Sequence, residues 1–149
     1  MWHVRDAAAA EFDAVGALMV RSVLAAPSPY PPAHRRAWAA AGPRAGPVWA
    51  ARLAGQAVVV EDGLRGVMTV GREGAVDLAF VAPEARGAGL FRALHAAMLA
   101  RAPAGPLSTF ASLAAEGPFR ACGWRVTERE VVEIAGLSFR RAAMVRAAP

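Results

Sequence analysis

The sequence contains no lysine and only one cysteine, Cys122, among its 149 residues. A single cysteine excludes an internal disulfide, and it supplies too few thiolates for a cysteine-based zinc site. The three histidines, His3, His34 and His95, are scattered along the chain without the spacing of metal ligands. We therefore expect a protein that uses no metal cofactor.

Long apolar runs are absent too, because no stretch of the sequence approaches the length needed to cross a bilayer. The alanine run at residues 7–10 is short, and the acidic residues Glu11 and Asp13 follow it closely. This pattern is unlike a secretory signal peptide. The sequence therefore predicts a cytoplasmic protein with no membrane partner.

The basic residues are 17 arginines against 12 acidic residues, which gives a net charge of +5. One interpretation is a general solubility charge with a bias toward arginine and alanine. The other is an attractive surface for a polyanion, either a small ligand that carries phosphates or a nucleic acid. Because no basic run or basic helix face stands out, we favour the first interpretation and expect no nucleic-acid partner.

The length and composition fit one globular domain that spans residues 1–149. Hydrophobic residues make up 56% of the chain and charged residues 19%, which is typical of a compact protein rather than a disordered one. No internal repeat and no linker divides it. The segment 25–47 is rich in alanine and proline, but Tyr30 and Trp38 indicate that it is packed and ordered.

Hydrophobic periodicity and turn residues predict a chain of alternating short elements. Three consecutive strands followed by strand–helix alternation favour an α/β fold with a mixed sheet of about six or seven strands and helices on both faces. The expected strands are 2–5, 56–61, 64–70, 75–81, 107–111, 124–134 and 138–145. The expected helices are 11–24, 33–41, 48–53, a helix from the glycines after 86 to about 102, and 113–122.

The most informative stretch is 76–94, an apolar strand, a turn with Arg86, Gly87 and Gly89, and the start of a helix. Glycines at such a turn let the backbone approach a ligand closely, and the free amides of the helix attract an anion such as a pyrophosphate. The spacing is neither that of a Rossmann fingerprint nor that of a P-loop. An ordinary turn would also use glycine.

The turn resembles the pyrophosphate-binding motif of the Gcn5-related N-acetyltransferases, Arg/Gln-x-x-Gly-x-Gly/Ala. Arg86 and Gly89 match this motif and Phe91 departs from it. The resemblance extends to other segments in the same order and spacing. These are the strand 76–83, the stretch 112–124, and an amino-terminal part with Tyr30, Pro31, Pro32, Trp38, Trp49, Arg52 and Leu53.

The resemblance implies a single-domain acetyltransferase-like α/β fold and an acetyl-CoA-dependent N-acetyltransferase. Such an enzyme moves the acetyl group to a primary amine by direct attack in a ternary complex, without a covalent enzyme intermediate. It also implies that a bulge near Phe80 and Val81 exposes the Val81 backbone amide for the thioester oxygen. The residues implied for acetyl-CoA are Phe80, Val81, Arg86, Gly87, Ala88, Gly89, Leu90, Phe91 and Ser112.

The candidate for a general base or an amine anchor is Asp77, which has the same strand parity as Val81. An aspartate at a strand edge, solvated or paired with an arginine, is the alternative. Tyr30, His34 and Trp38 are candidates for the acceptor pocket, although core packing explains these aromatic residues equally well. The identity of the amine, expected to be a small molecule, cannot be derived from the sequence.

Several positions bear on whether the protein is an active enzyme. Phe119 stands where the family usually has a tyrosine that protonates the leaving thiolate, so a non-catalytic acyl-CoA-binding or sensing domain is the main alternative. Ser112 fits a helix cap better than a cofactor contact. Cys122 is interpreted as a small buried hydrophobe rather than a nucleophile. A homodimer is the commonest assembly for such a protein.

Overall fold

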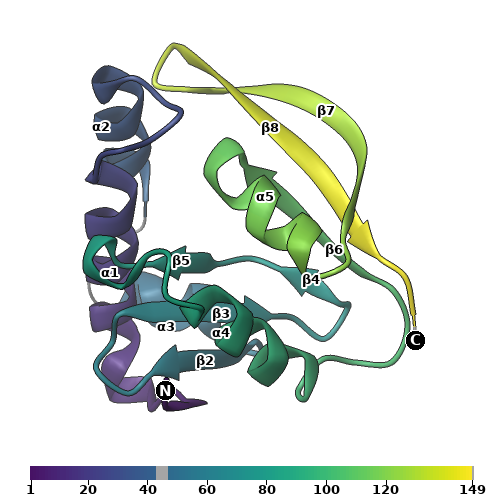
Figure 1. The fold of residues 1–149 in the computed structure, drawn as a ribbon. Helices are drawn as coiled ribbons and strands as arrows, with labels where there is room; N and C mark the ends of the chain where they lie inside the picture. The colour runs from purple at the N-terminus through teal and green to yellow at the C-terminus, as the bar shows by residue number, and fades with distance from the viewer. Residues whose placement is uncertain (43–46, 149) are drawn as a thin grey trace.

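The computed structural model describes residues 1–42 and 47–148, in which eight strands, five α-helices and two short 3₁₀ turns follow one another (Figure 1). The strands are β1 Val4–Asp6, β2 Ala57–Glu61, β3 Gly66–Val70, β4 Ala75–Val76, β5 Ala79–Val81, β6 Leu107–Ser112, β7 Arg125–Ile134 and β8 Leu137–Arg146. The helices are α1 Phe12–Leu24, α2 Pro32–Ala41, α3 Pro47–Leu53, α4 Leu90–Leu99 and α5 Leu113–Ala121. The 3₁₀ turns are η1 Ala9–Glu11 and η2 Pro83–Ala85.

The strands form two four-stranded sheets instead of the single mixed sheet that we expected. The first has the order β1-β2-β3-β5 and is antiparallel throughout, and the second has the order β4-β6-β8-β7. The mixed character comes from the second sheet, where β4 and β6 are parallel and the other pairs are antiparallel. The mixed α/β class is confirmed, and the sheet is divided at the strand that leads into the glycines.

The main correction to the predicted elements concerns that strand, because the segment 75–81 forms two strands, β4 and β5, instead of one. Val76 pairs with Thr109 of β6, whereas Ala79 pairs with Met68 of β3, so the chain changes sheets at residues 77–78. At the break, the Leu78 N–H donates to the Thr69 hydroxyl at 3.0 Å instead of to a backbone carbonyl. The irregularity in this strand therefore lies earlier in the chain than the bulge expected near Phe80 and Val81.

Helices cover both faces of the first sheet, as the composition of β2 requires. Val59 belongs to the core under α4, while Val58 and Val60 belong to the core under α1 and α3. In Figure 1, α4 lies in front of β2 and β3, and α1 stands along the other side. A strand buried on both faces is apolar without alternation, which explains the run of three valines.

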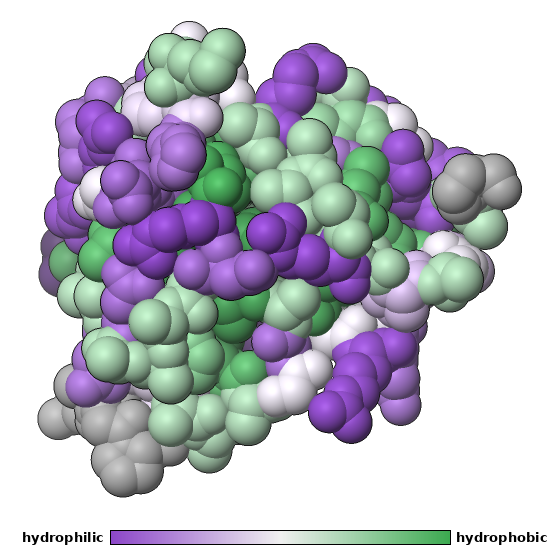
Figure 2. All heavy atoms as spheres, turned by 90° about the horizontal axis from the view of Figure 1, so that it is seen from below, coloured by the Kyte–Doolittle hydropathy of each residue, from purple (hydrophilic) through white to green (hydrophobic). Residues whose placement is uncertain are grey.

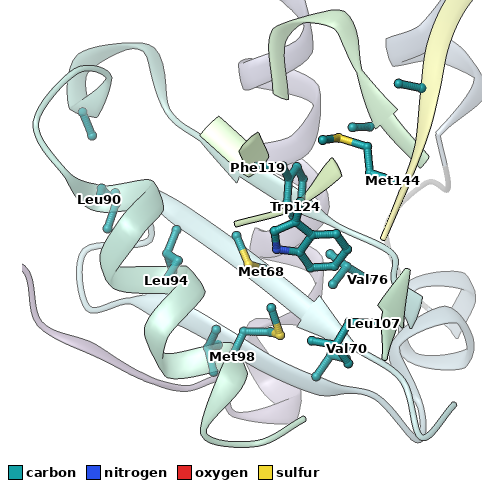
Figure 3. Close-up of a cluster of buried hydrophobic side chains, with 14 residues drawn as sticks. Met68, Val70, Val76, Leu90, Leu94, Met98, Leu107, Phe119, Trp124 and Met144 are labelled. Atoms are coloured by element: carbon teal, nitrogen blue, oxygen red, sulfur yellow. The ribbon is translucent and has the colours of Figure 1, made fainter. Parts of the chain in front are cut away.

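The core under α4 continues beneath the second sheet (Figure 3). Its members come from β3, α4, β6, α5 and β8, and Phe119 and Trp124 lie at its centre. On the face of the molecule shown in Figure 2, a band of hydrophilic side chains crosses a surface of hydrophobic residues. No helix in the described part of the chain is both long and apolar enough to span a membrane.

The other predicted boundaries differ from the structure by a few residues. The strand predicted at 64–70 begins at Gly66, because the Glu61 carboxylate accepts the amides of Gly63 (2.8 Å) and Arg65 (3.2 Å) and so closes a longer turn. The helix predicted to run to about 102 ends at Leu99. The segment 25–47 is ordered where it is described and contains α2, while residues 43–46 lie outside the described part.

Candidate active site

A cavity of about 490 Å³ lies between the end of α1, the segment before α2, β5, the turn before α4, and α5. It is lined by β5, the last strand of the first sheet, and by Ser112 at the end of β6 in the second sheet, so it lies between the two sheets. Most of the predicted cofactor and acceptor residues meet there. The lining contains Ser22, Val23, Ala25, Pro27, Ser28, Tyr30, Trp38, Ala79, Phe80, Val81, Ala85, Arg86, Gly87, Gly89, Leu90, Phe91, Arg92, Ser112, Ala114, Ala115, Pro118, Ala121 and Cys122.

One end of the cavity is formed by the glycine loop, which we define as residues 86–89. Gly87 (φ +73°) and Gly89 (φ +82°) both adopt the left-handed conformation that side-chain-bearing residues rarely adopt. Gly89 is the N-cap of α4, and no side chain caps the helix through a hydrogen bond. The first amides of a helix have no intrahelical partner, so this end presents donors and the positive end of the helix dipole.

The glycine loop is held by the side chain of Trp2, which was not among the residues predicted for the site. The Trp2 Nε1–H donates to the Ala88 carbonyl oxygen at 2.7 Å. The Arg65 guanidinium lies 5.0 Å from the centroid of the Trp2 ring, and the buried Glu61 carboxylate accepts the Arg65 Nε–H at 2.7 Å. Ala88 does not line the cavity. Its carbonyl connects the glycine loop to Trp2, which lies just before β1 of the first sheet.

The Arg86 side chain holds α1 against the same loop. Its guanidinium donates to the carbonyl oxygens of Ser22 (2.9 Å) and Pro27 (3.3 Å), near the C-terminus of α1. A cation at a helix C-terminus is favourable for the helix dipole as well as for the free carbonyls. Arg86 was expected at the cofactor, and in this structure its charged group contacts protein carbonyls.

The Val81 backbone amide faces the open edge of β5. The Thr69 N–H donates to the Leu78 carbonyl at 2.9 Å, and the Ala82 N–H donates to the Arg65 carbonyl at 2.7 Å. Because successive amides of an antiparallel strand point to opposite sides, the even-numbered amides face β3 and the Val81 amide points away from it. β5 is the last strand of the first sheet, so this donor is directed into the gap.

The opposite end of the cavity is aromatic. The Tyr30 and Trp38 rings lie 5.9 Å apart in an edge-to-face arrangement, and the Trp38 and Phe80 rings lie 6.0 Å apart. The Tyr30 hydroxyl donates to the Arg140 carbonyl oxygen at 2.6 Å and accepts the Leu113 N–H at 3.0 Å. Burial raises the pKa of Tyr30, although the Leu113 amide partly opposes the rise.

The two departures from the family pattern contact each other. The Phe91 and Phe119 rings lie 5.1 Å apart, edge to face, and Phe119 also lies 4.9 Å from Trp124. Phe119 is buried, so it packs beneath the cavity instead of facing it. The Trp124 Nε1–H donates to His95 Nε2 at 2.8 Å. Burial, with the nearby arginines, lowers the pKa of His95 to about 4.

Asp77 and His34, both expected at the site, do not line the cavity. The Asp77 carboxylate accepts hydrogen bonds from Arg52 (3.0 and 3.1 Å) and Gln56 (3.0 Å). Burial acts to raise the pKa of Asp77, but these hydrogen bonds outweigh it and hold the pKa below its ordinary value. His34 packs edge to face on Phe139 at 5.0 Å. Asp77 therefore has the arginine-paired arrangement that was considered as the alternative to a base.

Ser112 and Cys122 line the cavity from the α5 side. The Ser112 hydroxyl accepts the Ala115 N–H at 3.2 Å, which is the helix cap expected from the sequence. Cys122 is partly exposed, and burial raises the pKa of its thiol. A protonated thiol is a poor nucleophile, so Cys122 forms part of the wall.

Ser22 is a lining residue that the sequence did not suggest. It is 6% exposed, and its hydroxyl has no hydrogen-bond partner among the described residues. A buried hydroxyl without a partner costs stability unless something else bonds to it. The available signal was a serine on the apolar face of a helix, between Met19 and Val23.

Within the described part of the chain, no aspartate or glutamate lines the cavity. Nor does any group of three or more His, Cys, Asp and Glu side chains there have an arrangement that could hold a metal ion. The polar groups that the lining residues carry are backbone amides, three serine hydroxyls, Tyr30, the Trp38 indole, the Cys122 thiol and arginines. This donor set suits a phosphate-bearing ligand with an uncharged arm.

No protein-family model matches the sequence, and no curated protein matches it. Solved structures match nearly its whole length. A GCN5-related N-acetyltransferase from Rhodopseudomonas palustris has a TM-score of 0.81 and 24% identity, over 99% of this chain and 96% of that chain. The yncA protein from Salmonella typhimurium, solved with its cofactor acetyl-CoA, has a TM-score of 0.64 and 19% identity, over 99% and 94%.

A ribosomal-protein-alanine N-acetyltransferase from Brucella melitensis is similar as well. Its TM-score is 0.67 at 18% identity, with coverage of 97% of this chain and 99% of that chain. At this level of identity the likeness establishes the fold. The chain therefore has the fold of the GCN5-related N-acetyltransferases, as the resemblance of its motifs predicted.

Proposed function

We propose that the protein is an acetyl-CoA-dependent N-acetyltransferase that acts on a primary amine. The observation that carries the proposal is the cavity between the splayed sheets. It has the glycine loop and the α4 N-terminus at one end and the outward-facing Val81 amide on its wall. The similarity in fold to an acetyltransferase solved with acetyl-CoA supports the same assignment.

The residues present fit acetyl-CoA. The free amides from Gly87 to Phe91 would hold its pyrophosphate at the positive end of α4. Gly87 and Gly89 have open space where a Cβ would be, so the loop leaves room for a large anion. The unpartnered Ser22 hydroxyl is a buried polar group in need of a partner. The apolar middle of the cavity would take the pantetheine arm.

When bound, acetyl-CoA supplies an activated acetyl group, so that the amine nitrogen bonds to the carbonyl carbon, the carbon–sulfur bond breaks, and an amine proton leaves. The chain contributes the Val81 amide, which would donate to the thioester oxygen as negative charge develops there. A fixed donor of this kind lowers the barrier by about 3 kcal/mol. Holding both reactants in one cavity also removes much of the entropic cost of their encounter.

Proton transfer uses no carboxylate of the described lining, and Phe119 has no donor for the thiolate. Asp77 is paired with Arg52 outside the cavity, and Tyr30 uses its hydroxyl proton on the Arg140 carbonyl. We therefore propose that the amine arrives as its free base and that solvent protonates the leaving thiolate. Positioning and the Val81 amide would then supply most of the rate.

The test is thermal unfolding with acetyl-CoA, followed by release of CoA in the presence of amines. A ligand at about 100 times its dissociation constant adds about 2.7 kcal/mol of stability, so acetyl-CoA should raise the melting temperature clearly and more than ATP does. CoA release that depends on an added amine would then establish the transfer. An unchanged melting temperature at saturating acetyl-CoA would refute the proposal.

A second function, a non-catalytic acyl-CoA-binding domain, is favoured by one observation. Phe119 is buried against Phe91 and offers no hydroxyl near the cavity. This function predicts the same rise in melting temperature, with no CoA release for any amine. Turnover with one amine would exclude it.

A further inference from the structure

The end of the cavity opposite the glycine loop is a wall of three aromatic rings. Tyr30 comes from the segment before α2, Trp38 from α2 and Phe80 from β5. Tyr30 is buried, whereas Trp38 and Phe80 are partly exposed and can contact a ligand. Their ring contacts at 5.9 and 6.0 Å make the wall continuous.

Three carboxylates of elements near this wall are paired with arginines. Asp77 pairs with Arg52 at 3.0 Å, and Glu84 pairs with Arg21 at 2.6 Å. Glu130 pairs with Arg141 on the hairpin of β7 and β8. Since no carboxylate of the described residues lines the cavity, a ligand with several ammonium groups would find no counter-charge. The net charge of +5 adds a general repulsion.

We propose that the acceptor is a primary amine attached to an aromatic or similarly apolar body, with no second cationic group. This inference rests on the acetyl transfer proposed above, and it names the class of substrate for the same cavity. Trp38 and Phe80 are the specificity-determining side chains, because they line the cavity away from the glycine loop and are partly exposed.

Two physical effects select this class. Aromatic rings bury the apolar body of the amine. A second ammonium in the same apolar space would be desolvated without a partner, which is strongly unfavourable. The same space favours the uncharged form of the amine, which is the form that attacks the thioester. The pH dependence of the rate should therefore follow the pKa of the acceptor.

The experiment compares 2-phenylethylamine, n-butylamine and 1,4-diaminobutane as acceptors at a fixed acetyl-CoA concentration. We expect kcat/KM to be highest for 2-phenylethylamine, and at least about tenfold lower for 1,4-diaminobutane than for n-butylamine. These two acceptors have the same chain length, so their comparison isolates the second charge. A preference for the diamine would overturn the inference while leaving acetyl transfer established.

Variants at the wall provide the second readout. Trp38→Leu and Phe80→Leu should each raise KM for 2-phenylethylamine about tenfold, and Trp38→Leu should leave KM for acetyl-CoA unchanged. Phe110→Leu is the matched control, because Phe110 is 60% exposed and outside the cavity lining. An unchanged KM for 2-phenylethylamine in both wall variants would overturn the inference.

Binding measurements distinguish a failure of the proposed acetyl transfer from a failure of the inferred acceptor class. If acetyl-CoA stabilises the protein but no amine is acetylated, transfer is refuted, and calorimetry of 2-phenylethylamine with the CoA-bound protein decides the inference. Binding of 2-phenylethylamine that Trp38→Leu weakens and Phe110→Leu does not would still support the aromatic site. Absence of binding would overturn it.

Discussion

The two ends of the cavity are built in different ways. The glycine-loop end uses the backbone of one short stretch, with positive φ angles at Gly87 and Gly89 and free amides at the start of α4. The aromatic end uses the side chains of Tyr30, Trp38 and Phe80, which lie in three separate elements. A backbone site leaves a local pattern in the sequence, whereas a site made of distant side chains leaves none.

The ends also differ in what they can discriminate. Backbone amides at a helix N-terminus bind any suitably placed anion, so this end would select a phosphate and little else. Aromatic side chains have a particular shape and no charge, so their end would select the body of the acceptor. Substitutions at the glycine-loop end should therefore alter the affinity for acetyl-CoA and leave the affinity for the acceptor unchanged. Substitutions at the aromatic end should do the reverse.

The largest expected effect is a loss of acetyl-CoA affinity when the glycine loop is altered. Gly89→Ala places a side chain at φ +82°, which costs about 1–2 kcal/mol and shifts the loop amides to relieve the strain. Losing one charge-assisted hydrogen bond of about 2 kcal/mol would weaken acetyl-CoA binding about thirtyfold. Calorimetric titration with acetyl-CoA measures this loss.

Gly136→Ala is the matched control for this prediction. Gly136, in the turn between β7 and β8, has φ +77° and open space around it, as Gly89 has. The two variants should lose similar stability, and only Gly89→Ala should lose affinity. Equal affinity losses would mean that strain alone explains the effect and that the loop does not bind the cofactor.

The next effect uses Cys122, in the cavity wall beside α5, as a reporter. Cys122 is the only thiol in the sequence and it lines the cavity. Acetyl-CoA at ten times its dissociation constant should slow alkylation of Cys122 by N-ethylmaleimide about tenfold, since the bound form is shielded. ATP, which lacks the pantetheine arm, should protect less. Equal labelling rates with and without acetyl-CoA would place the ligand elsewhere.

A smaller effect tests the support of the loop. Trp2→Phe keeps a ring beneath Arg65 but removes the hydrogen bond to the Ala88 carbonyl. One hydrogen bond contributes about 1 kcal/mol, so we expect about fivefold weaker acetyl-CoA binding. Trp38→Phe also removes an indole N–H, but at the aromatic end, and it should leave the affinity for acetyl-CoA unchanged. If both variants behave alike, the two ends are not independent.

Much of the fold could be predicted from local sequence patterns. The glycine loop, the helix after it and the Ser112 cap depend on residues that are adjacent in the chain, and the structure has all three. Most element boundaries were within a few residues. The strand 75–81 was wrong because its break depends on the Thr69 hydroxyl of another strand.

The same break explains why Asp77 lies outside the cavity lining. Its assignment relied on equal parity with Val81 along one straight strand, and parity has no meaning across residues 77–78, where the chain changes sheets. Trp2 and Ser22 were missed for a related reason. Trp2 acts through a hydrogen bond to Ala88, 86 residues away along the chain, and Ser22 lines the cavity beside segments that are distant in the sequence.

The smallest effect is a pH dependence of the unfolding free energy that comes from His95, a buried residue of α4. The pKa of His95 is about 4 in the folded protein against an ordinary value of 6.5, so the unfolded state takes up the proton first. Stability is therefore full above pH 6.5 and falls as pH decreases toward 4. Between about pH 7.5 and about pH 6 the expected loss is about 0.8 kcal/mol.

His95→Gln tests this linkage, because an amide oxygen can still accept the Trp124 Nε1–H but does not titrate in this range. The variant should show a flatter dependence of the unfolding free energy on pH, while His3→Gln at an exposed histidine should match the wild type. Chemical denaturation at several pH values measures the slopes. Carboxylates such as Glu61, with a pKa of about 2 against 4.5, contribute only at lower pH. A wild-type slope in His95→Gln would assign the pH dependence to other groups, and the buried imidazole would then be a packing residue alone.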